Sequence, residues 1–176
     1  MTSRTTRAKL IACSIGALTA ATLALSASPA SASGTYSGQP YVYGAGAFSN
    51  DWDDEGILST DTNTSSNATC LWQKILWADG NLTSASDIDG VFGSQTKAAT
   101  KAWQSDWEAS PDGVVGKETF GKAGDWLRDT DGDGAVDTYI GTDHVISVSR
   151  DDQGRYHFYD GDGNGRIAGY DYRTCS

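Results

Sequence analysis

The sequence predicts an α+β fold, in which a three-helix bundle is followed by a small C-terminal antiparallel β-meander. Three observations predict it. First, the segment at Asp89–Thr96, Asp-Gly-Val-Phe-Gly-Ser-Gln-Thr, is repeated at Asp112–Thr119 as Asp-Gly-Val-Val-Gly-Lys-Glu-Thr. Second, each copy leads into a segment whose apolar residues have helical spacing. Third, after Asp129 apolar and polar residues alternate between Asp- and Gly-rich turns, a pattern typical of strands.

The first 32 residues have the pattern of a secretory signal peptide. Arg4, Arg7 and Lys9 precede an apolar run from Leu10 to Leu25, and residues 30–32 form a small-residue cleavage site. The run is too short and too rich in Ala, Ser and Thr to predict a membrane span. We therefore expect a bacterial protein that is secreted, either extracellular or associated with the cell wall, and not held in the membrane after cleavage.

The chain is strongly acidic. Its formal net charge is −10, and cleavage would remove three basic residues and no acidic ones, which gives −13. Most of the acidic residues are Asp, which favours loops, helix caps and cation sites over long charged helices. Nucleic acid is excluded as a partner because its binding depends on Lys and Arg displacing counterions. We expect a monomer.

Two cysteines remain after the signal, Cys70 and Cys175. An even pair in an exported protein predicts one disulfide, with two free thiols as the alternative. The bond would enclose about 100 residues, and the chain-entropy estimate for such a loop is about 4–5 kcal/mol. It would tie the C-terminal tail to the start of the first helix.

Between the signal and the tail we expect three segments. Residues 33–67 are a Gly-, Ser- and Tyr-rich lead-in without a clear period, which predicts a linker whose aromatic rings either pack on the domain or form a binding strip. Residues 68–128 are the helical domain, and residues 129–176 are an Asp-rich β appendage. The expected helices run from an Asn67 N-cap to about Ala78, from Ser94 to about Glu108, and from Lys117 to Leu127.

The appendage is expected to form three or four strands in a meander. A short ribbon is marginal in water by itself, so one face should pack against the bundle or the lead-in. The apolar side chains that we assign to this face are Val145, Tyr156, Phe158 and Tyr170.

From Cys70 to Leu127 the chain resembles the three-helix peptidoglycan-binding domain that is appended to bacterial wall hydrolases. The matching residues are Leu71-Trp72-Gln73-Lys74-Ile75-Leu76, both Asp-Gly-Val-x-Gly-x-x-Thr copies, Ala99 and Ala102-Trp103-Gln104. The chain is also similar to secreted actinomycete wall-binding proteins with a Trp-Gln-x-Ile-Leu-Trp-Ala-Asp-Gly segment. It departs from the family at Thr69-Cys70, where a long aliphatic residue is usual.

The resemblance implies non-catalytic binding of peptidoglycan, through either its glycan or its stem peptide. Carbohydrate recognition places aromatic faces on sugar C–H surfaces and pairs hydroxyls with amides and carboxylates. The candidate ligand-binding residues are Trp72, Gln73, Trp77, Gln95, Trp103, Gln104 and Trp107. Core packing is the preferred interpretation of Trp72 and Trp103, so Trp77, Gln104 and Trp107 are the favoured wall contacts. We expect the two Asp-Gly turns to be architectural.

Two Asp-rich loops could bind calcium, the only cofactor that the sequence suggests. The first has Asp129, Asp131, Asp133 and Asp137 at positions 1, 3, 5 and 9 of a calcium loop, but Ile140 stands at position 12 where a bidentate carboxylate is needed. The second is more complete, with Asp171 at position 12. Its possible ligands are Asp160, Asp162, Asn164, Arg166 and Asp171. The alternative for both loops is an acidic hairpin turn.

Catalytic signatures are weak, and we do not expect an enzyme. His144 and His157 are the only histidines, and they lack zinc-site spacing, while no Gly-x-Ser-x-Gly elbow occurs. Two other functions stay open. One is a calcium-binding structural or interaction protein that uses the bundle as a scaffold. The other is a small wall-active hydrolase with an acidic pair such as Asp53 and Glu55.

Overall fold

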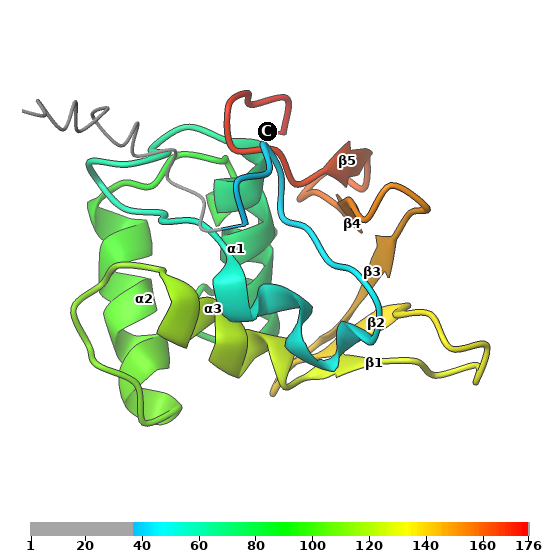
Figure 1. The fold of residues 1–176 in the computed structure, drawn as a ribbon. Coiled ribbons are helices and arrows are strands. Elements are labelled where there is room, and N and C mark those ends of the chain that lie inside the picture. Colours follow the sequence, from blue (N-terminus) through cyan, green and yellow to red (C-terminus); the bar gives the residue numbers. More distant parts are fainter. Residues whose placement is uncertain (1–36, 176) are drawn as a thin grey trace, which may run out of the picture. The chain divides into compact units, whose positions relative to one another are not determined.

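A computed structural model describes residues 37–175 of the chain, and its elements follow the predicted α+β order (Figure 1). The expected signal peptide, residues 1–32, lies outside the described residues. The helices are η1 Phe48–Asp54, α1 Asn67–Ala78, η2 Ala85–Asp87, α2 Ser94–Asp106 and α3 Lys117–Gly124, of which η1 and η2 are 3-10 helices. The strands are β1 Leu127–Arg128, β2 Thr138–Ile140, β3 Val145–Arg150, β4 Tyr156–Tyr159 and β5 Gly165–Ile167.

Helix α1 begins one residue earlier than predicted, because its N-cap is Ser66. The Ser66 hydroxyl oxygen accepts a hydrogen bond from the Thr69 N–H at 3.0 Å. Asn67, the predicted cap, is buried and binds the C-terminal tail instead, since its Oδ1 accepts the Thr174 N–H at 2.8 Å. In the part of the chain that the structure describes, no helix has the length and apolar character needed to cross a membrane.

The five strands form one antiparallel sheet in the order β1-β2-β3-β4-β5. Val148 of β3 faces Phe158 of β4, and both side chains are buried, as are Tyr156 and Tyr170. The assignment of Val145 to the inner face is wrong. Its side chain is 64% exposed, because successive residues of a strand point to opposite faces and Ile146 takes the inner position.

The lead-in is part of the hydrophobic core, and it does not form a linker. Trp52 of η1 is fully buried, and its ring centroid lies 5.3 Å from that of Tyr156 and 6.1 Å from that of Phe120. Helix α3 can approach Trp52 closely because Gly124 has no side chain: a Cβ there would lie 3.2 Å from the Trp52 Cβ. The described residues, 37–175, accordingly make one compact unit, in which lead-in, helices and sheet share a core.

The buried carboxylate of Glu55 links the lead-in to the C-terminal part of the chain. Glu55 is fully buried; its Oε1 accepts the Tyr43 N–H at 2.6 Å, and its Oε2 accepts the Tyr170 hydroxyl at 2.6 Å. Burial raises the pKa of Glu55 from 4.5 to about 8, because removing the charged carboxylate from water outweighs the hydrogen bonds that favour it.

The disulfide predicted between Cys70 and Cys175 is present and buried. It attaches the tail to the first turn of α1, beside the hydrogen bonds that Asn67 makes with the tail. The helix end that lacks the family's aliphatic residue is therefore held by a covalent bond.

Replacing Cys70 and Cys175 with Ala together should lower the free energy of unfolding by about 2–5 kcal/mol, because the unfolded chain regains the entropy of a large loop. Urea denaturation of the purified full chain measures this loss. An unchanged unfolding midpoint would contradict the stabilising role of the bond.

Glu55 should make the protein less stable as pH rises from about 4.5 to about 8. In this interval the unfolded chain has lost the Glu55 proton while the folded chain keeps it, so the contribution of this group to stability is largest below pH 4.5 and disappears above pH 8. The Glu55→Gln variant, which imitates the protonated acid, should show a flatter dependence. Thermal unfolding at a series of pH values, with Asp53→Asn as the exposed control, checks the difference; parallel curves for Glu55→Gln and the unmodified protein would refute it.

Candidate functional site

Each repeated turn is closed by a buried glutamine from the helix before it. In the first copy this residue is Gln73 of α1. Its Nε2 donates to Asp89 Oδ1 at 2.9 Å, to the Val91 carbonyl at 3.1 Å and to Thr96 Oγ1 at 3.0 Å. Its Oε1 accepts the Gly90 N–H at 2.7 Å. One amide thus joins the helix, the turn and the start of the next helix.

The second copy repeats this arrangement with Gln104 of α2. Its Nε2 donates to Asp112 Oδ1 at 3.0 Å, to the Val114 carbonyl at 2.9 Å and to Thr119 Oγ1 at 3.0 Å. Its Oε1 accepts the Gly113 N–H at 2.8 Å. The identical set of partners explains why both copies carry Asp, Gly and Thr at the same spacing.

This geometry changes the assignment of two candidate residues. Gln73 and Gln104 are each only 1% exposed, and their amides are saturated by the turns. Their predicted role as ligand contacts is therefore corrected: these amides hold the fold together. The geometry supports the architectural interpretation of the turns.

Trp72 and Trp103 belong to the core, as their position on the apolar stripes predicts. Both are fully buried, with ring centroids 5.1 Å apart in an edge-to-face arrangement. The Trp72 indole N–H donates to Thr100 Oγ1 at 2.9 Å, and the Trp103 indole N–H donates to Asp79 Oδ2 at 2.7 Å. Neither ring is available to a ligand at the surface.

Trp77, near the end of α1, is half-buried and has close neighbours. The His144 imidazole stacks on its indole, with ring centroids 4.0 Å apart and an angle of 8° between the planes. The Lys74 ammonium lies 4.8 Å from the ring centre. Because His144 covers one face of the indole, a sugar could stack on that face only after the imidazole moved away.

Trp107 is the candidate whose surroundings best suit a surface contact. It is half-buried at the end of α2, and its ring centroid lies 4.9 Å from that of Trp126, which is also half-buried. The Arg128 guanidinium carbon lies 5.7 Å from the Trp126 ring centre. We call Trp107, Trp126 and Arg128 the aromatic surface. Gln95 is also exposed, on the first turn of α2.

Trp126 was missed by the sequence reasoning. It follows α3 and precedes β1, outside the apolar stripes of both elements, so no periodicity marks it. The predicted helix from Lys117 to Leu127 contained Trp126 without assigning it to the buried face, and the structure places it in the turn before β1. Its contact with Trp107 depends on the packing of α2 beside α3.

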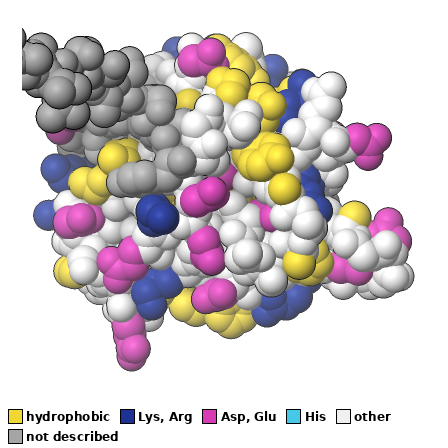
Figure 2. All heavy atoms as spheres, viewed as in Figure 1, with side chains coloured by type: hydrophobic (Ala, Val, Ile, Leu, Met, Phe, Trp, Pro, Cys, Tyr) yellow, Lys and Arg dark blue, Asp and Glu magenta, His cyan; other side chains and the backbone are white. Residues whose placement is uncertain are grey.

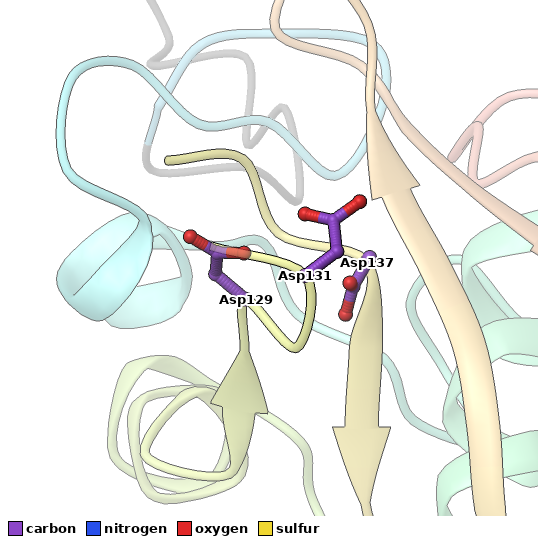
Figure 3. Close-up of side chains that lie close together, drawn as sticks. All are labelled: Asp129, Asp131 and Asp137. Carbon is purple, nitrogen blue, oxygen red and sulfur yellow. The ribbon is translucent and has the colours of Figure 1, made fainter. Parts of the chain in front are cut away.

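The first Asp-rich loop joins β1 to β2 and brings three carboxylates together (Figure 3). Oxygen atoms of Asp129, Asp131 and Asp137 lie within 4.8 Å of one another. The Asp129 carboxylate accepts the Gly132 and Gly134 N–H groups at 2.7 and 2.8 Å, and these bonds lower its pKa. Asp137 Oδ1 is buried without a hydrogen-bond partner. Asp133 is exposed and stays outside this group of three.

The second loop joins β4 to β5 and is closed differently from the calcium loop that its spacing suggests. Asp160 is buried, and its Oδ2 accepts the Arg166 Nε–H at 2.7 Å. Its Oδ1 accepts the Asn164 N–H at 2.8 Å. The Arg166 guanidinium therefore forms an ion pair with Asp160 and lies beside the carboxylate where a bound calcium ion would be expected. Asp162 and Asp171 do not join Asp160 in a group of three carboxylates in the described chain.

Charged side chains are spread over the surface. On the face shown in Figure 2, acidic groups are scattered among basic and uncharged ones and form no single acidic patch.

In the proposed acidic pair, Asp53 is exposed and Glu55 is fully buried. The His157 Nε2 lies 2.9 Å from Asp151 Oδ2, and the Arg155 guanidinium forms a salt bridge with the same carboxylate.

In the comparison with known proteins, a family model matches the helical part of the chain. Residues 65–122 match the family model described as "Putative peptidoglycan binding domain". No curated protein matches the chain, and no solved structure does. The match spans α1, α2, nearly all of α3 and both glutamine-closed turns. Residues 65–122 are therefore similar to the peptidoglycan-binding family that the repeated turns resemble.

Proposed function

We propose that this protein is a secreted, non-catalytic peptidoglycan-binding protein that is held at the cell wall by non-covalent contacts. The observation that carries this proposal is the family match over residues 65–122, together with the two complete glutamine-closed turns inside it. The signal-peptide pattern of residues 1–32 supports export.

The aromatic surface is the proposed place of contact with the wall. Trp107 and Trp126 offer partly exposed ring surface in contact with each other, and such surface suits the C–H faces of sugar rings. Arg128 beside them can donate hydrogen bonds to hydroxyl or carboxylate oxygens. Trp77 is a poorer candidate because His144 covers one of its faces.

The surroundings of the reactive side chains support a binding role. Cys70 and Cys175 are joined in the disulfide, so neither of these two is a nucleophile. Glu55 is fully buried and cannot reach a glycan in this conformation. His144 stacks on Trp77, and His157 is paired with Asp151, so neither is placed beside a nucleophilic hydroxyl by the contacts described.

The Trp107→Ala and Trp126→Ala variants should each bind insoluble peptidoglycan about fivefold more weakly, since one aromatic contact contributes about 1 kcal/mol. Co-sedimentation with purified wall over a range of protein concentrations measures the dissociation constant. Tyr159→Ala is the matched control, because it removes an aromatic ring that is 56% exposed on β4. Far-UV circular dichroism confirms that each variant is folded.

The outcomes separate the three functions. If the unmodified protein does not co-sediment, with or without calcium, wall binding is refuted and a scaffold role is favoured. If soluble muropeptides are released during the incubation, the protein is a hydrolase. Equal weakening by Tyr159→Ala would remove the aromatic surface as the contact.

We also propose that the loop from Asp129 to Asp137 binds one calcium ion. The observation that favours it is the convergence of three carboxylates, one of which has a buried oxygen without a hydrogen-bond partner. Hard oxygen ligands of this kind suit calcium, and a cation would offset the repulsion among the three charges. Strand β2 supplies Ile140 at position 12, so we expect weak binding, with a dissociation constant on the order of 10⁻⁴–10⁻³ M.

Calcium at millimolar concentration should raise the melting temperature of the full chain, because it binds the folded state. Asp131→Asn should abolish the shift, since it removes an exposed ligand charge. Asp162→Asn, in the loop closed by Arg166, is the matched control and should leave the shift intact. Calorimetry with no heat at millimolar calcium would eliminate the site.

A further inference from the structure

The two repeated turns are covered by different parts of the chain. The first is covered by the C-terminal tail: a Cβ on Gly90 would lie 2.6 Å from the Cys175 Sγ and 2.9 Å from the Arg173 Cδ. The Arg173 guanidinium also donates to the Asp89 carbonyl at 2.7 Å. Gly90 has a φ of +72°, so glycine is required there on both conformational and steric grounds. The first turn is thus occupied by the protein itself.

The second turn is covered by two lysines. A Cβ on Gly113 would lie 2.8 Å from the Lys97 Cγ and 3.0 Å from the Lys101 Cγ. When the two copies are aligned on their glutamines, Lys101 takes the place of Cys70, which carries the tail in the first copy. The lysine methylene groups replace the tail as cover, and lysines packed in this way keep their ammonium groups towards solvent.

These two lysines have no acidic partner. They lie four residues apart on α2, and among residues 37–175 no Asp or Glu forms an ion pair with either. Like charges at this spacing destabilise a helix by about 0.2–0.5 kcal/mol. Two neighbouring cations without an acidic partner complement an anionic ligand.

The same turn also borders a hollow. Asp112 and Val114 line a cavity of about 220 Å³ together with Ser110, Lys117 and Glu118. The second turn therefore has the two lysines over its glycine and also borders a depression lined by hydrogen-bonding side chains. The first turn has no corresponding pair of cations, because Ser66 and Cys70 stand at the aligned positions.

We propose that Lys97 and Lys101, whose side chains cover the second turn, bind the carboxylates of a peptidoglycan stem peptide through their ammonium groups. This inference rests on the proposed wall-binding function and names the part of peptidoglycan that this turn recognises. Carboxylates of the stem peptide supply the negative charge that the uncharged sugar rings lack. The aromatic surface and the lysine pair would then contact different parts of the same polymer.

The probe is the soluble stem pentapeptide L-Ala–γ-D-Glu–diamino acid–D-Ala–D-Ala, titrated into the full chain by calorimetry at low salt. The Lys97→Met/Lys101→Met variant keeps the methylene cover of Gly113 and should bind the peptide about three- to tenfold more weakly. Lys97→Arg/Lys101→Arg should keep the affinity. Lys122→Met, which removes a lysine from α3, is the control against a general charge effect and should change the affinity less than twofold.

Co-sedimentation with intact wall freed of teichoic acid, with the pentapeptide as competitor, separates the outcomes. The inference predicts that the pentapeptide displaces the unmodified protein from the wall, and that it displaces the Lys97→Met/Lys101→Met variant less well. No displacement by the pentapeptide, with co-sedimentation of the lysine variants unchanged, would overturn it and leave the proposed function standing. Absence of binding to intact wall would overturn the proposed function as well. Binding that needs retained teichoic acid would assign the lysines to phosphate and overturn the stem-peptide inference.

Discussion

The helical domain depends on one interaction used twice, the insertion of a buried glutamine amide into an Asp-Gly-Val turn. A buried amide that lost its partners would cost about 1–3 kcal/mol for each group left unsatisfied. Gln73 and Gln104 avoid this cost because turn and following helix present the same set of donors and acceptors. The requirement for an Asp carboxylate, a Gly N–H and a Thr hydroxyl at fixed spacing follows from that geometry, and so does the repeat.

The lead-in and the sheet are arranged around these two turns. Leu58 forms a β-bridge with Val115 at the second turn, and Ser65 forms one with Val91 at the first, so residues 58–65 connect both turns. The preceding η1 helix brings Trp52 against α3 and the sheet. The tail returns to the first turn through the disulfide. The β appendage is therefore attached to the domain at its core and at its terminus.

Such a framework restricts where a ligand can bind. Its glutamines and the Trp72–Trp103 pair are buried and cannot contact a ligand at the surface. Two places remain: the partly exposed rings of Trp107 and Trp126, where α2, α3 and β1 meet, and the lysine pair at the second turn. The sheet adds negative charge, yet its two Asp-rich loops differ. Arg166 neutralises the buried Asp160, whereas Asp129, Asp131 and Asp137 share no basic partner among the salt bridges of the described residues. Unneutralised charge thus lies at two separate places, the lysine pair at the second turn and the three carboxylates of the first Asp-rich loop.

The sequence by itself determined what depends on near neighbours: the three helices, the two turns and the change to strands. Local periodicity and turn residues carry that information. The tertiary structure decided what depends on distant partners. Gln104 was a predicted ligand contact, but its amide is bound by the turn that begins eight residues further along, at Asp112. Trp52 had no period to mark it as core, and the strand register alone put Ile146 inside and Val145 outside. Contact between Trp107 and Trp126 likewise arises only when α2 and α3 pack, because burial is a property of the assembled chain.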